Sequence, residues 1–109
     1  FNPAAAAVEQ LFYTSNQKTV IEVAEARGVI LLALRERGVP IYEYTPLQVK
    51  MALTGYGRAT KRQMMETTRL RLKLDKIPRP DDAADALAIA LCHAGTSMLT
   101  ARAEKSIQR

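Results

Sequence analysis

Three acidic residues in this chain have a spacing and setting that suit metal chemistry. Asp82 and Asp85 lie three positions apart at the start of an expected helix, and Glu9 stands far upstream in an apolar stretch. Side chains three apart on a helix lie about 5–6 Å apart at Cβ, so the two aspartates could share a hard cation through oxygen ligands. The pattern therefore indicates a metal site.

Helix capping is the alternative interpretation of the same aspartates. Pro80 cannot lie inside a helix, and a first turn favours negative charge because of its free N–H groups and the helix macrodipole. These preferences explain Asp82 well. Asp85 is harder to explain as a cap, because its side of the helix is expected to be buried. That side also carries Ala88, Ile89 and Cys92.

Length and composition set bounds on the rest of the chain. The 109 residues, 48% of them hydrophobic, predict one domain with a modest core. A single cysteine, Cys92, excludes an internal disulfide and fits a reducing compartment. Cys92 and the lone His93 are too few for zinc, so a core thiol beside a helix-surface histidine is expected. Apolar runs such as Val29–Leu34 are too short to span a membrane, and the first residues lack signal-peptide features.

The positive charge is concentrated in one segment. The chain has a formal net charge of +5, and residues 58–79 contain eight basic and two acidic side chains. Such a patch is expected of a protein that binds polyanions, because neutralised phosphates release their counterions. A solvated helix face without a nucleic-acid partner is the alternative.

Alternating helices and strands are expected along the chain. The predicted elements are a helix at 17–37, a strand at 39–44, and helices at 46–53, 61–74 and 82–94. Thr45 and Thr60 each open a capping-box pattern, and Gly38, Gly55 and Gly95 are expected to end helices. The first element is ambiguous. Its pattern favours a helix, whereas a strand at 7–13 would form a parallel crossover unit and place Glu9 in a sheet.

Five blocks of sequence together resemble the RuvC family of Holliday-junction resolvases. They follow the family's order and spacing, and the resemblance covers residues 1 to about 94. The blocks are Val8–Phe12, Ala26–Gly28, Glu43–Lys50, Gly55–Lys61 and Pro80–Ala90. The resemblance implies an α/β, ribonuclease-H-like fold with a mixed sheet flanked by helices, in which Glu9 lies on a strand.

The same resemblance implies an enzyme and its site. It implies a homodimer that binds four-way junction DNA and nicks two strands of like polarity, using two Mg²⁺ ions for which Mn²⁺ can substitute. The implied metal ligands are Glu9, Asp82 and Asp85. Lys50 and Lys61 match positively charged residues associated with catalysis and backbone binding, which can counter charge that develops on the phosphate. Phe12 matches an aromatic that stacks on an unpaired base. The expected DNA-binding residues are Phe12, Arg58, Lys61 and Arg62.

Each of these residues also has a structural explanation. Glu9 could be a solvent-facing strand residue, Lys50 an ordinary helix-surface lysine, and Phe12 a core residue. The joint spacing of the five blocks favours the site interpretation for Glu9 and the aspartates, whereas the two interpretations of Phe12 stay open.

The departure from the family pattern lies at the front of the chain. Members of the family begin with strands that carry a further catalytic aspartate, and this chain starts at Phe1, close to their fourth strand. We therefore expect residues 1–94 to be the carboxy-terminal part of one nuclease domain, 95–109 to be a basic tail, and this chain alone to be inactive.

Further expectations concern partners and surroundings. We expect a branch-migration complex as a partner, no association with a membrane, and a location in the bacterial cytoplasm. The helix at 17–37 is the suggested dimer face, because Gly28 permits close approach of another helix. Two other functions stay open: a non-catalytic basic DNA-binding or assembly module, and a nuclease that acts on another branched nucleic acid.

Overall fold

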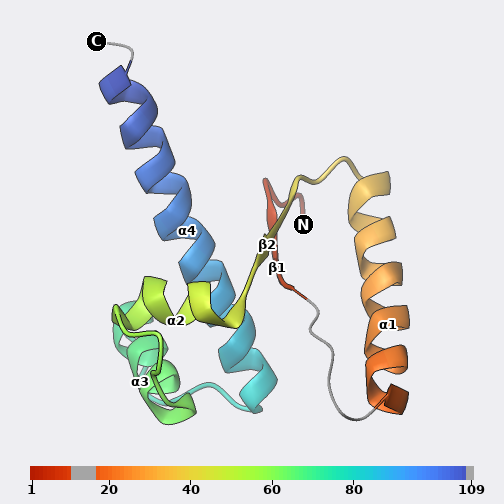
Figure 1. Ribbon diagram of the computed structural model, residues 1–109, viewed down its shortest axis with the longest axis horizontal. Coiled ribbons are helices and arrows are strands. Elements are labelled where there is room, and N and C mark those ends of the chain that lie inside the picture. Colours follow the sequence, from red (N-terminus) through yellow and green to blue (C-terminus); the bar gives the residue numbers. More distant parts are fainter. Residues whose placement is uncertain (11–16, 108–109) are drawn as a thin grey trace.

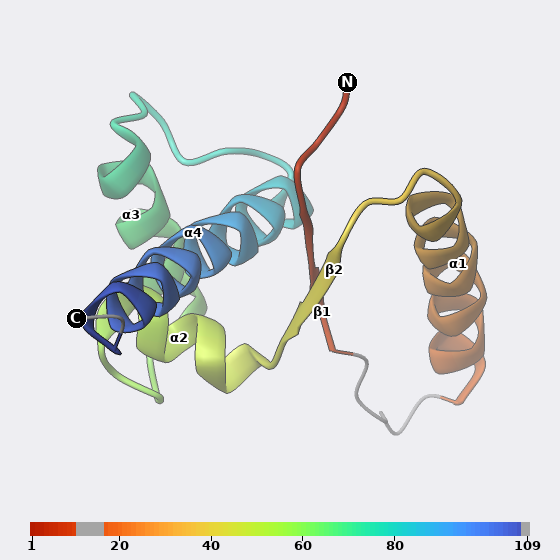
Figure 2. The same ribbon diagram turned by 90° about the horizontal axis from the view of Figure 1, so that it is seen from above.

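The chain folds around a small parallel sheet that has helices on both sides (Figure 1). A computed structural model describes residues 1–10 and 17–107, with side chains for 1–10 and 19–99. Helix α1 lies on one side of the strands, and α2, α3 and α4 lie together on the other, as the second view confirms (Figure 2). The elements are β1 (Ala6–Glu9), α1 (Gln17–Glu36), β2 (Ile41–Tyr44), α2 (Pro46–Thr54), α3 (Lys61–Leu72) and α4 (Asp81–Ile107).

The two strands pair in parallel, with Ala6 opposite Ile41 and Glu9 opposite Tyr44. The helix that the local pattern favoured for the first element is therefore wrong, and the strand alternative is confirmed. Alanine-rich sequence favours a helix by propensity, but pairing with β2 supplies backbone hydrogen bonds that decide the conformation. Helix α1 connects the two parallel strands. Glu9 is the last residue of β1 and lies at the end of the sheet next to α4.

Both predicted capping boxes are present. The backbone N–H of Gln48 donates to Thr45 Oγ1 at 3.1 Å, and the backbone N–H of Thr45 donates to Gln48 Oε1 at 2.7 Å. Thr60 and Gln63 repeat this exchange at the start of α3. Gly55 ends α2 with φ of 74°, a left-handed conformation that costs glycine little. Local sequence therefore fixes where α2 and α3 begin.

Two predicted helix ends are wrong. Helix α3 stops at Leu72 rather than Leu74, because Lys73 adopts a left-handed conformation with φ of 56°. Helix α4 continues through Gly95 to Ile107, so residues 95–107 of the expected tail are helical. A glycine ends a helix when it turns left-handed, and Gly95 is not among the positive-φ residues. In this setting it is only a helix-interior residue of low propensity.

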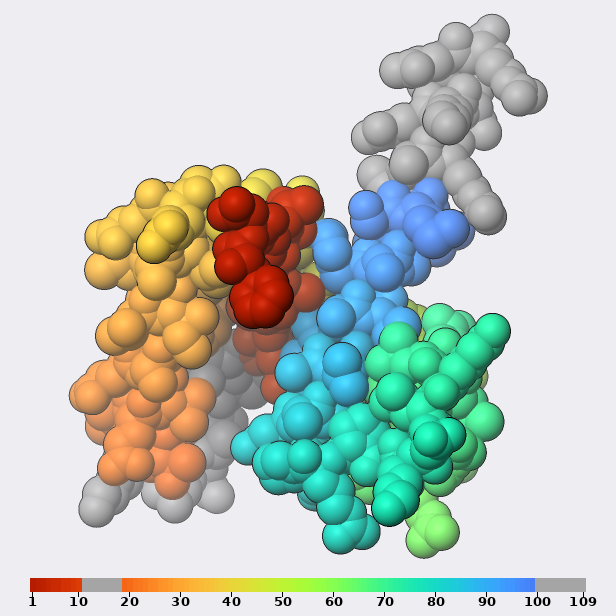
Figure 3. All heavy atoms as spheres, turned by 180° about the vertical axis from the view of Figure 1, so that it is seen from behind, coloured from red at the N-terminus to blue at the C-terminus, as the bar shows by residue number. Residues whose placement is uncertain are grey.

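The core lies between β2, α2 and α4. Its buried side chains are Tyr44, Val49, Leu53, Ala88 and Cys92. The prediction of Cys92 as a core thiol is confirmed, since 1% of it is exposed. Residues 1–10, red in Figure 3, lie between α1 and α4 when the molecule is seen from behind.

Helix α1 lies outside this core. Its described side chains include several large apolar ones that are exposed, namely Ile21, Val23, Val29, Ile30 and Leu32. Within the described part of the chain, no helix combines the length and the apolar character needed to cross a membrane.

Candidate active site

A cleft of about 250 Å³ lies where the end of β1 meets α2, α3 and α4. Four charged residues line it, and each comes from a different element: Glu9, Lys50, Lys61 and Asp85. Its remaining lining is mainly apolar and includes the buried Ala59, Ala84 and Ala88. The fold thus brings together four of the five predicted catalytic residues, which are separated by up to 76 positions in sequence.

The closest charged contact in the cleft is between Lys61 and Asp85. Lys61 Nζ donates to Asp85 Oδ1 at 2.5 Å, and the two side chains are 51% and 46% exposed. The hydrogen bond that Lys61 donates to Asp85 is the main cause that raises the pKa of Lys61, so the ammonium is charged at neutral pH. An ion pair this exposed adds at most about 1 kcal/mol to stability. Stability alone therefore explains little of this arrangement.

The position of Lys61 is unusual for a helix start. It occupies the first turn of α3, where the macrodipole and free N–H groups favour acidic rather than basic residues. Arg62 follows it in the same turn, and no acidic residue is present there. The first turn of α3 therefore presents positive charge at the rim of the cleft, which is favourable for binding an anion.

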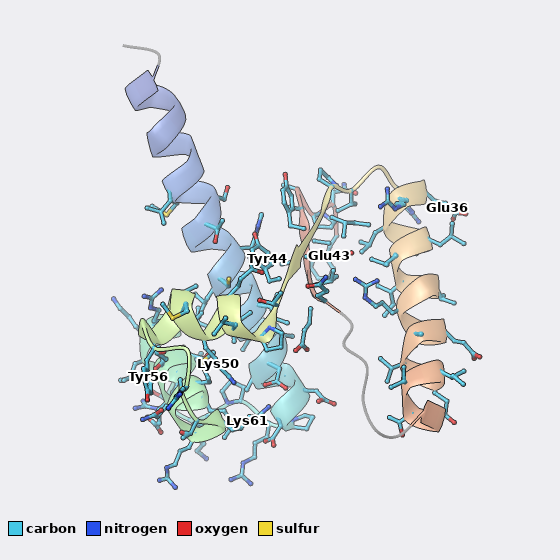
Figure 4. All side chains as sticks on the ribbon, in the orientation of Figure 1. Glu36, Glu43, Tyr44, Lys50, Tyr56 and Lys61 are labelled. Carbon is cyan, nitrogen blue, oxygen red and sulfur yellow. The ribbon has the colours of Figure 1, made fainter. Side chains whose placement is uncertain are left out.

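Glu9 and Lys50 line the same cleft from the sheet and from α2. Figure 4 shows Lys50 and Lys61 lying toward the start of α4. Among the described residues, neither Glu9 nor Lys50 makes a side-chain hydrogen bond or ion pair. Their charged ends are therefore available to a ligand in the cleft.

Asp82 is not among the residues that line this cleft, although its charge helps to raise the pKa of Lys61. It is exposed in the first turn of α4 and lines a neighbouring hollow with Asp81, Arg79 and Met65. In the part of the chain that the structure describes, no three His, Cys, Asp or Glu side chains come close enough to hold a metal ion. The predicted set of three ligands is thus not assembled, although Glu9 and Asp85 share a cleft.

These two carboxylates fit a hard divalent cation by donor chemistry. Mg²⁺ is commonly held by one or two carboxylates, with waters and substrate phosphates completing its octahedral shell. Glu9 and Asp85 would hold such an ion, and the lysines beside them would face its phosphate ligands.

The predicted DNA-binding residues differ in what the structure says of them. Arg58 and Arg62 are exposed, as a DNA-binding role requires. Phe12 lies outside the described residues. Arg69, which was counted in the basic patch, donates to Glu66 Oε2 at 3.1 Å and to the Leu74 carbonyl at 3.2 Å, so much of its charge is used internally.

One contact beside the site was missed by the sequence interpretation. His93 was expected on the helix surface, but it is half-buried and its Nδ1 lies 2.5 Å from the Tyr44 hydroxyl. The Tyr42 ring lies 4.5 Å from the His93 ring, centroid to centroid. A strand tyrosine and a histidine 49 positions later carry no local signal of their contact.

Solved structures with the same fold identify the class of protein. The chain superimposes on Thermus thermophilus RuvC with a TM-score of 0.82 and 44% sequence identity, over 90% of this chain and 59% of that one. For T. thermophilus RuvC in complex with Holliday junction substrate, the TM-score is 0.86 at 44% identity, over 92% of this chain and 61% of that one. The expected α/β, ribonuclease-H-like fold is confirmed.

Sequence comparison gives the family. The model of the family described as crossover junction endodeoxyribonuclease RuvC matches residues 1–93. RuvC of Roseiflexus sp. (strain RS-1) is 56% identical over 105 residues, which are 96% of this chain and 62% of that protein. RuvC of Petrotoga mobilis is 59% identical over 93 residues, or 85% of this chain and 57% of that protein. This chain belongs to the RuvC family, and it spans about 60% of the length of these relatives.

Proposed function

We propose that the chain is the part of a RuvC-type endonuclease that carries most of the catalytic cleft, and that the enzyme resolves four-way DNA junctions. The convergence of Glu9, Lys50, Lys61 and Asp85 from four elements on one cleft carries this proposal. Family membership supports the reaction class, and the relative in complex with Holliday junction substrate supports the kind of DNA.

The roles of the acidic residues follow from their chemistry. Glu9 and Asp85 would hold a divalent cation, and Asp82, in the preceding turn of α4, would supply a further oxygen. We propose two Mg²⁺ ions, for which Mn²⁺ can substitute. When bound, such ions activate the attacking water and stabilise the leaving 3′ oxygen of a phosphodiester.

The lysines act on the phosphate. Lys50 and Lys61 place positive charge where negative charge develops on the phosphate oxygens in the transition state. Lys61 is paired with Asp85 at 2.5 Å, and its ammonium would be free to face the phosphate if Asp85 held a cation instead. The same contact therefore couples occupancy of the carboxylates to the position of a catalytic lysine.

DNA binding involves residues outside the cleft. Arg58, Lys61 and Arg62 contact backbone phosphates, which their exposure and positive charge favour. Phe12, three positions beyond Glu9, is proposed to stack on an unpaired base at the junction.

Paired nicks on a symmetric junction require two active sites. We therefore propose a homodimer, with α1 as the contacting helix because it exposes Ile21, Val29, Ile30 and Leu32. The enzyme is further proposed to act in the bacterial cytoplasm together with a branch-migration complex. A mass that stays monomeric in analytical ultracentrifugation at all protein concentrations would contradict the dimer.

The test uses a labelled mobile four-way junction. The chain, and a version extended at its start to the length of its relatives, are incubated with the junction with and without Mg²⁺. Paired, symmetric, Mg²⁺-dependent nicks that disappear in Asp85→Asn are the expected result for the extended version. Flaps and linear duplexes serve as competing substrates.

Two outcomes would favour the other functions. If both versions bind the junction and neither cuts it, and binding is unaffected by Mg²⁺ or by Asp85→Asn, the protein is a DNA-binding or assembly module. If flaps are cut faster than four-way junctions, the protein is a nuclease for another branched nucleic acid.

A further inference from the structure

A hydrogen bond joins the sheet to α4 close to the cleft. The Tyr44 hydroxyl on β2 and Nδ1 of His93 on α4 lie 2.5 Å apart, and Thr96 also forms a side-chain hydrogen bond with Tyr44. The Tyr42 ring covers the His93 ring at a tilt of 33°. Figure 4 shows Tyr44 between β2 and α4.

The bond is shielded from water. Tyr44 is 7% exposed and Cys92, the neighbour of His93 on α4, is 1% exposed. Burial raises the pKa of Tyr44, so its hydroxyl is protonated and available for hydrogen bonding over the physiological range. A buried hydroxyl without a partner costs about 1–3 kcal/mol, so this pairing holds the two elements at a defined separation.

Each of the two hydrogen-bonded residues is connected through the backbone to one of the cleft carboxylates. Tyr44 is the register partner of Glu9, and its carbonyl accepts from the Gln10 N–H at 2.8 Å. His93 lies eight positions after Asp85 on the same helix. Eight residues of α-helix form a rigid spacer of about 12 Å. The Tyr44–His93 contact thus connects the strand that carries Glu9 to the helix that carries Asp85.

We propose that Tyr44 and His93 are positioning residues that set the separation of Glu9 and Asp85. The inference rests on the proposed function, in which these two carboxylates act on one cation. The apolar cluster here includes two alanines, Ala7 and Ala88, and apolar contacts are not directional, whereas a hydrogen bond between two ring side chains fixes their relative position. Loss of the hydrogen bond loosens the carboxylate pair without removing either ligand.

The test measures Mn²⁺ binding to the chain by electron paramagnetic resonance. Tyr44→Phe and His93→Leu are each expected to lower the Mn²⁺ affinity about 10-fold or more, the range typical of groups that orient metal ligands. His93→Asn, whose amide can take the place of Nδ1, is expected to restore most of that loss. Tyr42→Phe is the matched control, because it keeps the ring contact with His93 and leaves the Tyr44 hydroxyl in place.

The controls separate the two ways in which the test can fail. Circular dichroism of each variant establishes that it is folded, and rescue by His93→Asn is an effect that general destabilisation does not produce. If Asp85→Asn abolishes Mn²⁺ binding while Tyr44→Phe and His93→Leu bind like the parent chain, the positioning role is overturned and the proposed function stands. If Asp85→Asn binds Mn²⁺ as tightly as the parent chain does, Asp85 is not a ligand, the proposed function fails, and the positioning role fails with it.

Discussion

Asp85 is the residue on which the chemistry of the cleft depends, because it has two competing cationic partners. One is the ammonium of Lys61, which lies 2.5 Å from its Oδ1. The other is the proposed divalent cation. A carboxylate oxygen that is engaged by an ammonium is a weaker ligand for a metal ion. Lys61 therefore influences metal affinity as well as catalysis.

Lys61→Met is expected to raise the Mn²⁺ affinity of the chain by up to about fivefold. It removes an ion pair that competes for Asp85 and whose free energy is at most about 1 kcal/mol. Arg62→Met removes one positive charge from the same helical turn without touching Asp85, and it serves as the control. Isothermal titration calorimetry measures both affinities. Equal changes in the two variants would show that overall charge, and not competition for Asp85, governs binding.

Asp85→Asn is expected to lower the pKa of Lys61 toward its ordinary value, because the hydrogen bond that Lys61 donates to the Asp85 carboxylate is the main cause of the raised pKa. A lysine with a raised pKa in the folded state stabilises the fold below its ordinary pKa of 10.5, and this contribution is lost as the pH rises through the raised value. NMR titration of the Lys61 side chain measures the shift. An unchanged pKa would contradict the ion pair.

At the scale of elements, the continuous helix α4 is the main departure from expectation. The local sequence around Gly95 suggested a helix end, but α4 passes through it. A glycine in a helix interior costs roughly 0.5–1 kcal/mol relative to alanine. A Cβ added at Gly95 would meet no heavy atom within 4 Å, so there is room for a side chain.

Gly95→Ala is therefore expected to stabilise the chain by roughly 0.5–1 kcal/mol. Gly55→Ala, in contrast, is expected to destabilise it, because φ of 74° at the end of α2 strains any residue with a Cβ. Urea denaturation of both variants measures the free energies of unfolding. Destabilisation by Gly95→Ala would indicate that the helix ends there.

At the scale of the whole molecule, the basic segment 58–79 is the feature expected to govern the proposed association with DNA. Arg58, Lys61 and Arg62 are exposed on or beside the first turn of α3, whereas Arg69 is engaged by Glu66 and by the Leu74 carbonyl. Only a charge that is free to approach phosphates releases counterions. The count of basic residues thus overstates the number available to DNA.

Arg62→Ala is expected to weaken binding to duplex DNA and to reduce the slope of log affinity against log salt by about 0.9, as for one lost phosphate contact. Arg69→Ala removes the same charge, but it is expected to change the slope much less because Arg69 bonds within the protein. Fluorescence anisotropy at several salt concentrations measures both slopes. Equal reductions of the two slopes would indicate that Arg69 also contacts DNA phosphates.

Much of the fold and part of the site could be predicted from local sequence. The capping boxes at Thr45 and Thr60 were predicted correctly because their hydrogen bonds join residues three apart. The start of α1 at Gln17 was also predicted correctly. The resemblance to the RuvC family selected Glu9, Lys50, Lys61 and Asp85 as site residues, and the fold places them on one cleft.

The sequence by itself thus determined the helix starts, the concentration of positive charge and the family, because these depend on neighbouring residues or on residue order alone. The family resemblance implied a strand that carries Glu9, but tertiary structure decided that residues 6–9 form a strand against their local preference for a helix, since the partner strand lies more than 30 positions away. It also decided that Lys61 pairs with Asp85, that Asp82 lines a different hollow from Glu9, and that Tyr44 meets His93. Such contacts depend on how whole elements pack, and no local propensity encodes that packing.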